Sequence, residues 1–262
     1  MDYLIVAVAA LMVSAMALYS GFGLGTLLMP VFALFFPIPI AVASTAVVHL
    51  ANNVFKVVVV GRKADWKIIL SFGLPAAVLA VPGAFLLVHM SNITPIFTYH
   101  IGERAFTITT VKLVVAVLIL SFATFELIPS LRQMEFSRRW MSLGGALSGF
   151  LGGVSGHQGA LRSAVLAKTN LDTTVFVGTV SVCAFMVDVS RLLVYGFTFF
   201  AEDFSKISEG NSMALVFVAT LAAFVGTYTG SKFLKQVTMK TVRQLVGSML
   251  ILIGLALTVG LI

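Results

Sequence analysis

Long apolar stretches separated by short polar loops dominate the chain. No Asp, Glu, Lys or Arg occurs between Tyr3 and Phe55, or between Ile68 and Gly102. About 20 apolar residues are enough for a helix to span a bilayer. Coarse apolar segments cover residues 3–36, 39–60, 67–90, 105–128, 140–168, 173–200, 213–234 and 241–262. This pattern predicts an all-α polytopic membrane protein, because a transmembrane barrel would show short alternating segments instead.

Two of these segments are interrupted by glycines. Segment 3–36 contains Gly21, Gly23 and Gly25, and segment 140–168 contains seven glycines between residues 144 and 159. A straight helix over residues 3–36 would be about 50 Å long, whereas the hydrocarbon layer is only about 30 Å thick. Glycine gives the backbone the freedom to leave the helix. We therefore expect each segment to form two helices folded back at the glycines.

The loop charges favour this hairpin plan. Lys and Arg are enriched in cytoplasmic loops, and they cluster here in three groups: Arg62, Lys63 and Lys67; Arg132, Arg138 and Arg139; and Lys232, Lys235, Lys240 and Arg243. The acidic loop 201–210 is expected outside. Because segment 173–200 crosses only once, segment 140–168 has to return to its starting side. The same reasoning places the N-terminus outside. The alternative is eight simple helices, with one loop that departs from the charge rule.

The two halves of the chain also match each other. A shift of 134 residues places Gly25 on Gly159 and Thr45 on Thr179, within the same order of glycine cluster, apolar arm and Thr-bearing helix. We expect a single transmembrane domain over 1–262 made of two inverted repeats, about 1–130 and 137–262. Each repeat has a Gly-broken hairpin followed by three transmembrane helices. This plan is typical of secondary transporters.

Composition excludes several other classes of protein. The chain has 17 Lys and Arg against 10 Asp and Glu, for a net charge of +7. The cytoplasmic loops explain this excess without a nucleic-acid partner. One cysteine leaves no intrachain disulfide and no Cys-rich metal site. The chain contains no phosphate-binding G-x-x-x-x-G-K-[ST] run and no metal-ligand spacing of His and carboxylates. We expect neither a metal nor another cofactor.

Polar side chains at membrane depth are costly and usually face the interior of the helix bundle. One stripe lies in segment 39–60, where the helical period aligns Thr45, His49, Asn52 and Lys56, with Asn53 beside them. We interpret this stripe as the lining of a cavity. The alternative is ordinary hydrogen bonding between helices.

A second polar group lies in segment 173–200. It contains Thr179, Asp188 and Arg191. Asp188 and Arg191 are three residues apart and could pair along one helix. Alternatively, Arg191 binds an anion while Asp188 orients it, or Asp188 carries a proton. An Arg suits an oxyanion because its planar fork donates paired hydrogen bonds.

The second glycine break carries the third polar group: Ser155, His157, Gln158, Gly159 and Arg162. Helix arms starting at Gly25 and Gly159 would direct free backbone N–H groups inward, and such ends bind anions. Arg162 would add a positive charge, unless it extends to the membrane surface. His157 or His49 could couple protons to transport, although a lone histidine is more often a hydrogen-bonded structural residue. These residues predict a midplane site for a small anion.

The chain resembles the sulfite exporter TauE/SafE-type family of bacterial membrane transporters. The resemblance lies in the broken Gly-rich stretch of each half, 21–30 and 153–163, in the Thr-bearing stretches 42–45 and 177–179, and in the small-residue stretch 226–232 before a basic turn. It covers nearly the whole chain. It implies a transporter of sulfite, sulfonates or related sulfur-containing anions in the bacterial inner membrane.

The function expected from these observations is a secondary transporter that exports such an anion by alternating access, and not an enzyme. Two alternatives stay open. One is a passive anion channel, and the other is an intramembrane enzyme using Ser155 and His157. The lipid bilayer is a further expected partner. A homo-oligomer is possible on the sequence, because small-residue faces such as 226–230 serve packing within or between chains.

Overall fold

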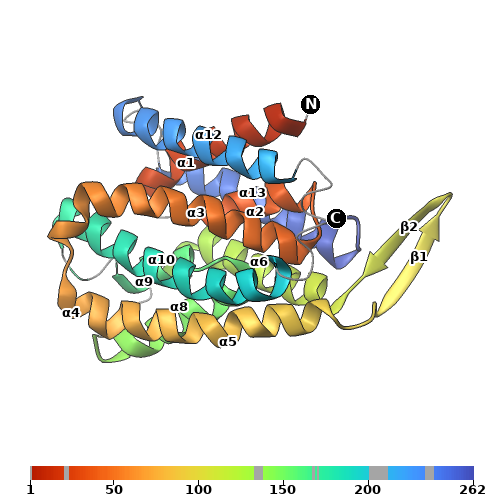
Figure 1. Ribbon diagram of the computed structural model, residues 1–262, viewed down its shortest axis with the longest axis horizontal. Helices are drawn as coiled ribbons and strands as arrows, with labels where there is room; N and C mark the ends of the chain where they lie inside the picture. Colours follow the sequence, from red (N-terminus) through yellow and green to blue (C-terminus); the bar gives the residue numbers. More distant parts are fainter. Residues whose placement is uncertain are drawn as a thin grey trace.

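The computed structural model describes residues 2–20, 24–132, 138–166, 169, 171–200, 212–233 and 239–262. Their helices run along the longest dimension of the molecule, and a β-hairpin projects beyond one end (Figure 1). Within this part of the chain, three helical stretches are long and apolar enough to cross a membrane: Ile38–Lys63, Trp66–Ser91 and Thr173–Thr198. Four shorter apolar helical stretches accompany them. The architecture is that of a helical membrane protein.

The first half contains α1 (Asp2–Ser20), α2 (Leu24–Ala33), α3 (Ile38–Val60), the 3₁₀ turn η1 (Gly61–Lys63), α4 (Trp66–Ile68), the π-helical turn η2 (Ile69–Gly73), α5 (Leu74–Ser91), α6 (Thr110–Leu127) and α7 (Pro129–Arg132). Local chemistry sets several of these starts. The Asp65 carboxylate accepts hydrogen bonds from the Lys67 and Ile68 backbone N–H groups at the start of α4. Thr109 caps α6 in the same way.

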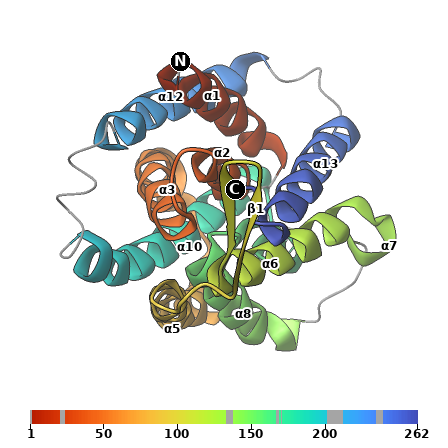
Figure 2. The same cartoon turned by 90° about the vertical axis from the view of Figure 1, so that its right-hand side faces the viewer.

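The second half contains the 3₁₀ turn η3 (Arg138–Trp140), α8 (Met141–Ser155), α9 (Gly159–Leu166), α10 (Thr173–Tyr195), the π-helical turn η4 (Gly196–Phe200), α12 (Ser212–Phe233) and α13 (Met239–Thr258). Seen end-on, α2 lies inside a ring of longer helices (Figure 2). The acidic loop 201–210 and residues 234–238 lie outside the described residues.

The second glycine-rich segment is broken as the sequence predicts. In the first, α1 ends at Ser20 and α2 begins at Leu24, and the expected break at residues 21–23 lies outside the described part. α8 ends at Gly156, which has a φ of 79°. Only glycine adopts this left-handed conformation without strain.

The arms α8 and α9 fold back on each other. A Cβ built on Gly152 would lie 2.7 Å from the Gln158 Cβ, and one on Gly144 would lie 2.9 Å from Val165 Cγ2. The start of α9 therefore contacts the end of α8, and the end of α9 contacts the start of α8. The two arms form the antiparallel hairpin that the length argument requires.

Small residues bring α8 very close to α5. A Cβ on Gly145 would lie 2.2 Å from the Phe72 carbonyl oxygen, and one on Gly149 would lie 1.8 Å from the Ala76 carbonyl oxygen. Gly153, four residues further along, meets the Ala80 carbonyl in the same way. Only glycine permits such backbone contact. This contact fixes the position of α8 and therefore of the second break.

A β-hairpin between α5 and α6 departs from the all-α expectation. Strands β1 (Phe97–Ile101) and β2 (Arg104–Ile108) pair in antiparallel register, and Gly102 turns between them with a φ of 61°. Phe97, Tyr99 and Phe106 stack along it. The predicted apolar segment 105–128 therefore begins as a strand, and its helix starts only at Thr110.

The direction of the helices places two basic groups at one end of the bundle. The hairpin follows the end of α5, whereas Arg62 and Lys63 lie in η1 before α5 begins. α6 leads away from the hairpin toward Arg132, and α8 starts beside Arg139 at that same end. The end opposite the hairpin is therefore the basic one, as expected for a cytoplasmic face.

Candidate functional site

The polar residues of the membrane-buried region meet where α3 crosses α10. His49 lies at the middle of α3, with eleven residues of the helix on either side. Gly178 of α10 packs against the Val60 carbonyl, whereas Asp188 lies beside His49. The two helices are therefore antiparallel, and their polar residues meet near mid-bundle.

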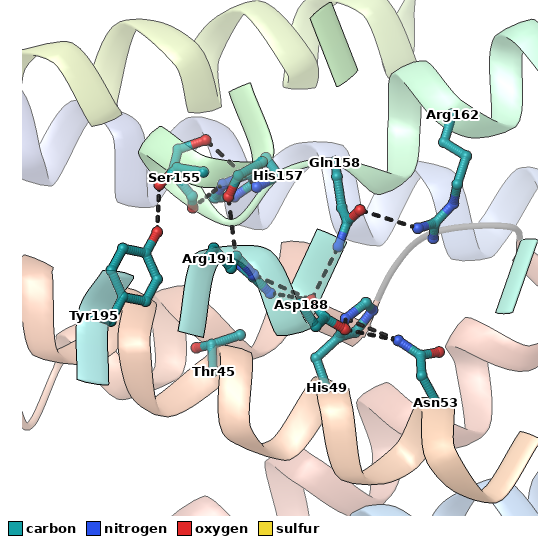
Figure 3. A network of polar contacts seen from close by, with 12 residues as sticks. Thr45, His49, Asn53, Ser155, His157, Gln158, Arg162, Asp188, Arg191 and Tyr195 are labelled. Atoms are coloured by element: carbon teal, nitrogen blue, oxygen red, sulfur yellow. Dashed lines mark hydrogen bonds and ion pairs between the residues drawn. The ribbon is translucent and has the colours of Figure 1, made fainter. Parts of the chain in front are cut away.

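The Asp188 carboxylate is the centre of the cluster (Figure 3). Oδ2 lies 2.6 Å from His49 Nδ1 and accepts a hydrogen bond of 2.9 Å from Asn53 Nδ2. Oδ1 accepts bonds from Gln158 Nε2 at 3.1 Å and from Arg191 Nε and Nη2 at 3.1 and 2.7 Å. Asp188 is completely buried. Such a carboxylate is stable only because charged and polar donors surround it.

Arg191 is held on all sides. Two of its nitrogens bond Asp188, and Nη1 donates to the Gly152 carbonyl at 3.3 Å. One turn along α10, the Tyr195 hydroxyl donates to the Gly153 carbonyl. The last carbonyls of α8 are thus bound to α10 by two side chains. The sequence interpretation missed Tyr195, although its spacing of four residues from Arg191 places it on the same helical face.

Arg162 is buried but weakly held. Its Nη1 donates to Gln158 Oε1 at 3.3 Å, its Nε has no hydrogen-bond partner, and the residue is 3% exposed. Lys56, half-buried on α3, lies within electrostatic range of it. Gln158 therefore connects the Asp188–Arg191 ion pair, in which the arginine is fully hydrogen-bonded, to the Arg162 guanidinium, which has an unpartnered nitrogen. A buried, unsatisfied cation marks a place where an anion would be stabilised.

The two glycine breaks meet beside this cluster. A Cβ on Gly25 would lie 3.0 Å from the Gly156 carbonyl oxygen, 3.7 Å from Thr45 Cγ2 and 4.0 Å from His49 Cδ2. On its other side, Gly156 faces Arg191 Nη1, which lies 3.3 Å from the corresponding Cβ position. The starts of α2 and of α9, at Gly159, therefore reach the same buried region. Helix starts of this kind favour anions.

Other predicted residues lie at the edge of the cluster or outside it. The Thr45 hydroxyl donates to the Ala41 carbonyl, within its own helix. Asn52 faces α12, where its Oδ1 accepts from the Thr227 hydroxyl and its Nδ2 has no partner. Thr179 lies at the basic end of the bundle, where its Oγ1 accepts from the Asp65 backbone N–H at 2.8 Å. The structure therefore does not bring Thr179 to the cluster.

Ser155 and His157 shape the second break. The Ser155 hydroxyl donates to the Leu151 carbonyl, and His157 Nδ1 bonds the Ser155 carbonyl at 2.7 Å. The His157 ring stacks on Phe122 of α6, with centroids 5.9 Å apart. In these contacts the hydroxyl proton points to the helix backbone, not to the imidazole. This arrangement does not resemble a nucleophile paired with its base.

The electrostatic balance of the cluster is positive. Arg191 forms an ion pair with Asp188, and the basic side chains of Arg162 and Lys56 are then in excess. Within the described part of the chain, no group of three or more His, Cys, Asp or Glu could hold a metal ion. The arrangement is suited to hold a small anion by guanidinium, amide and backbone N–H donors.

Comparison with known proteins identifies the family. The family model described as sulfite exporter TauE/SafE matches residues 4–257, which is nearly the whole chain. No curated protein and no solved structure matches the chain. Since the match includes both broken segments and every helix of the bundle, the chain belongs to the sulfite exporter TauE/SafE family of membrane transporters.

Proposed function

We propose that the protein is a secondary transporter that exports a small sulfur-containing anion, such as sulfite or an organosulfonate, across the bacterial inner membrane. The observation that carries this proposal is a buried guanidinium with an unpartnered nitrogen, that of Arg162, which Gln158 connects to the polar cluster where both glycine-rich segments meet. Gly25 touches the Gly156 carbonyl, and Arg162 Nε has no partner nearby. Family membership supports the class of substrate.

Arg162 is the residue to which we assign the anion. Both arginines of the cluster are buried, but only one has donors to spare. Arg191 already gives three nitrogens to Asp188 and Gly152. Arg162 has one long bond, to Gln158. An anion beside Arg162 would also lie next to Gln158 and within the electrostatic field of Lys56. The sequence interpretation had named Arg191 as the anion ligand and Arg162 as an additional positive charge.

The packing of the helices supports the inverted-repeat proposal, with repeats at about 1–130 and 137–262. α1 packs against α12, and its counterpart α8 packs against α5, the counterpart of α12. α3 packs against its own counterpart α10, and α6 packs against its own counterpart α13. Each contact is therefore kept when every helix is replaced by its counterpart, as a two-fold axis between the repeats requires.

The direction of the counterparts favours an axis in the membrane plane. α3 and α10 are antiparallel at the cluster. α6 and α13 are antiparallel too, because Leu127 meets Gly247, whereas Leu120 meets Gly254. A two-fold axis along the membrane normal would make counterparts parallel. This geometry is typical of transporters that alternate access by moving one repeat against the other.

Burial favours a carrier over a channel. Asp188 and Arg191 are fully buried, and His49, Gln158 and Arg162 are at most 3% exposed. An anion could reach them only after the helices move. Alternating access supplies that movement, whereas a passive channel needs a continuous open path.

The test replaces Arg162 and measures anion binding and efflux. Arg162→Gln removes the charge and leaves a shorter polar side chain that still carries an amide donor. Arg104→Gln, in the exposed strand β2, is the matched control. A charged hydrogen bond contributes about 1.5–3 kcal/mol, so we expect sulfite and sulfonate binding to weaken about 10- to 100-fold.

The purified parent and the control should bind alike and release the anion from proteoliposomes unchanged. Folded Arg162→Gln protein that binds sulfite and sulfonates as tightly as the parent would overturn the assignment. Recovery of a chemically altered product would favour the enzyme alternative.

A further inference from the structure

The donor set around Asp188 is the set that an oxyanion substrate would need. Five nitrogen atoms from four residues converge on this one carboxylate, and they come from α3, α10 and the second break. A sulfite or sulfonate group presents the same chemistry, with negative oxygens that accept paired bonds from Arg and single bonds from amides. The Asp188 carboxylate therefore accepts hydrogen bonds from the same kinds of donor that a bound oxyanion would need.

We infer that the Asp188 carboxylate is a built-in competitor of the transported anion, and that anion binding is linked to uptake of one proton by the His49–Asp188 pair. This inference rests on the proposed function and deepens it. It assigns the pair as the element that couples protons to anion binding.

The contacts of Gln158 show why the two anions compete. Gln158 Nε2 is 3.1 Å from Asp188 Oδ1, and Gln158 Oε1 is 3.3 Å from Arg162 Nη1. An anion bound at Arg162 therefore comes within one side-chain length of the carboxylate. Two like charges at this separation in a buried site repel strongly. The anion also needs the amide N–H that Asp188 now holds.

Protonation of the pair removes its net negative charge, and a proton on Asp188 itself also weakens its hold on the Gln158 amide. The pair consists of His49 Nδ1 and Asp188 Oδ2 at 2.6 Å, and one added proton changes its charge from −1 to zero. A monovalent anion then enters, so the total charge of the cluster returns to its starting value. The pair titrates as a unit, because the two groups are in direct contact.

Among the described residues, the charged and titratable groups around the His49–Asp188 pair come from α3, α9 and α10. α10 contributes Arg191 and Tyr195, and α9 contributes Arg162. Lys56 on α3 acts through Arg162. All of these groups except Tyr195 are cations, and none adds a second carboxylate. The pair is thus the place in the described cluster where an added proton compensates an added anion.

The experiment measures binding of methanesulfonate, which stays singly charged across the pH range used, to the purified full chain. Calorimetry in buffers of different ionisation enthalpy counts the protons taken up on binding. For the parent we expect about one proton per anion, and an affinity that falls about tenfold per pH unit once the pair is deprotonated. This measurement of proton uptake uses the parent protein alone and requires no variant.

Asp188→Asn is the decisive variant, because it keeps the shape and removes the competing charge. We expect it to bind methanesulfonate at pH 8 at least as tightly as the parent does at low pH, with a flat pH profile and no proton uptake. Asp65→Asn, at the start of α4 and outside the cluster, should behave as the parent does.

Binding by the parent without proton uptake would overturn the inference and leave the proposed function intact. So would a folded Asp188→Asn protein that has lost binding or kept the pH slope. Failure of the parent to bind any sulfur oxyanion at any pH would overturn the proposed function as well.

Discussion

The contact between α5 and α8 provides a direct test of how the second break is positioned. In Gly149→Ala, the added Cβ would lie 1.8 Å from the Ala76 carbonyl oxygen, 2.5 Å from its carbonyl carbon and 2.6 Å from its Cα. These are backbone atoms of a helix and cannot rotate away. To reach an ordinary contact, the two helices must separate locally by about 1.5 Å or more.

The size of the effect follows from two opposing contributions. Overpacking of a well-packed interior costs about 1–3 kcal/mol. Replacing a helical Gly by Ala returns up to about 1 kcal/mol through helix propensity. We expect a net loss of about 1–2 kcal/mol in the free energy of unfolding. Anion efflux should fall too, because a displaced α8 moves Gly156 away from Gly25.

The assay is unfolding of the purified protein in detergent, together with efflux from proteoliposomes. Gly196→Ala is the matched control, since Gly196 has helical backbone angles and no atom lies within 4 Å of its Cβ position. The control should be as stable as the parent or slightly more stable. If Gly149→Ala unfolds and transports as the control does, the close contact of α5 with α8 is not what positions the break.

Two further predictions concern the ion pair and the orientation. Arg191→Ala leaves the buried Asp188 carboxylate without its main counter-charge, so it should lower the free energy of unfolding by about 3–5 kcal/mol. If Arg191→Ala is as thermally stable as Arg162→Gln, the structural role of Arg191 is contradicted. In a Cys183→Ala background, Lys63→Cys and Glu103→Cys should react with a membrane-impermeant thiol reagent from opposite sides of the membrane, with Lys63→Cys on the cytoplasmic side. If both cysteines are labelled from the same side, the orientation of α5 is refuted.

Much of this architecture can be predicted from the glycines and the intramembrane polar residues of the sequence. The break at Gly156 and the restart of α9 at Gly159 follow from segment length and glycine content. The predicted polar stripe on α3 divides in the structure: His49 and Asn53 face Asp188, whereas Asn52 faces α12. The break and the stripe depend on residues close together in the sequence, so helical periodicity and segment length are enough to predict them.

Partners distant in sequence could not be predicted in this way. His49 and Asp188 lie 139 residues apart, and nothing in their local sequence states that they meet. The saturation of Arg191 and the spare donor of Arg162 likewise depend on which carbonyl and amide groups lie opposite. The roles of the two arginines could therefore only be separated in three dimensions.

Two features were misjudged for local reasons. Thr179 and Asp188 are nine residues apart, which at about 100° per residue places them on opposite faces of α10. The first residues of segment 105–128 were assigned to a helix because they are apolar. They form β2 instead, where alternating aromatic and β-branched side chains favour a strand and Gly102 turns the chain.

The central claim is that an anion binds deep in the bundle, against Arg162 and Gln158. The most direct measurement is a structure determined with selenite or a selenonate, in which the anomalous signal of selenium locates the anion. The account predicts a peak within hydrogen-bond distance of the Arg162 guanidinium and beside Gln158. A peak elsewhere, with this position unoccupied in protein that still transports the selenium compound, would contradict it.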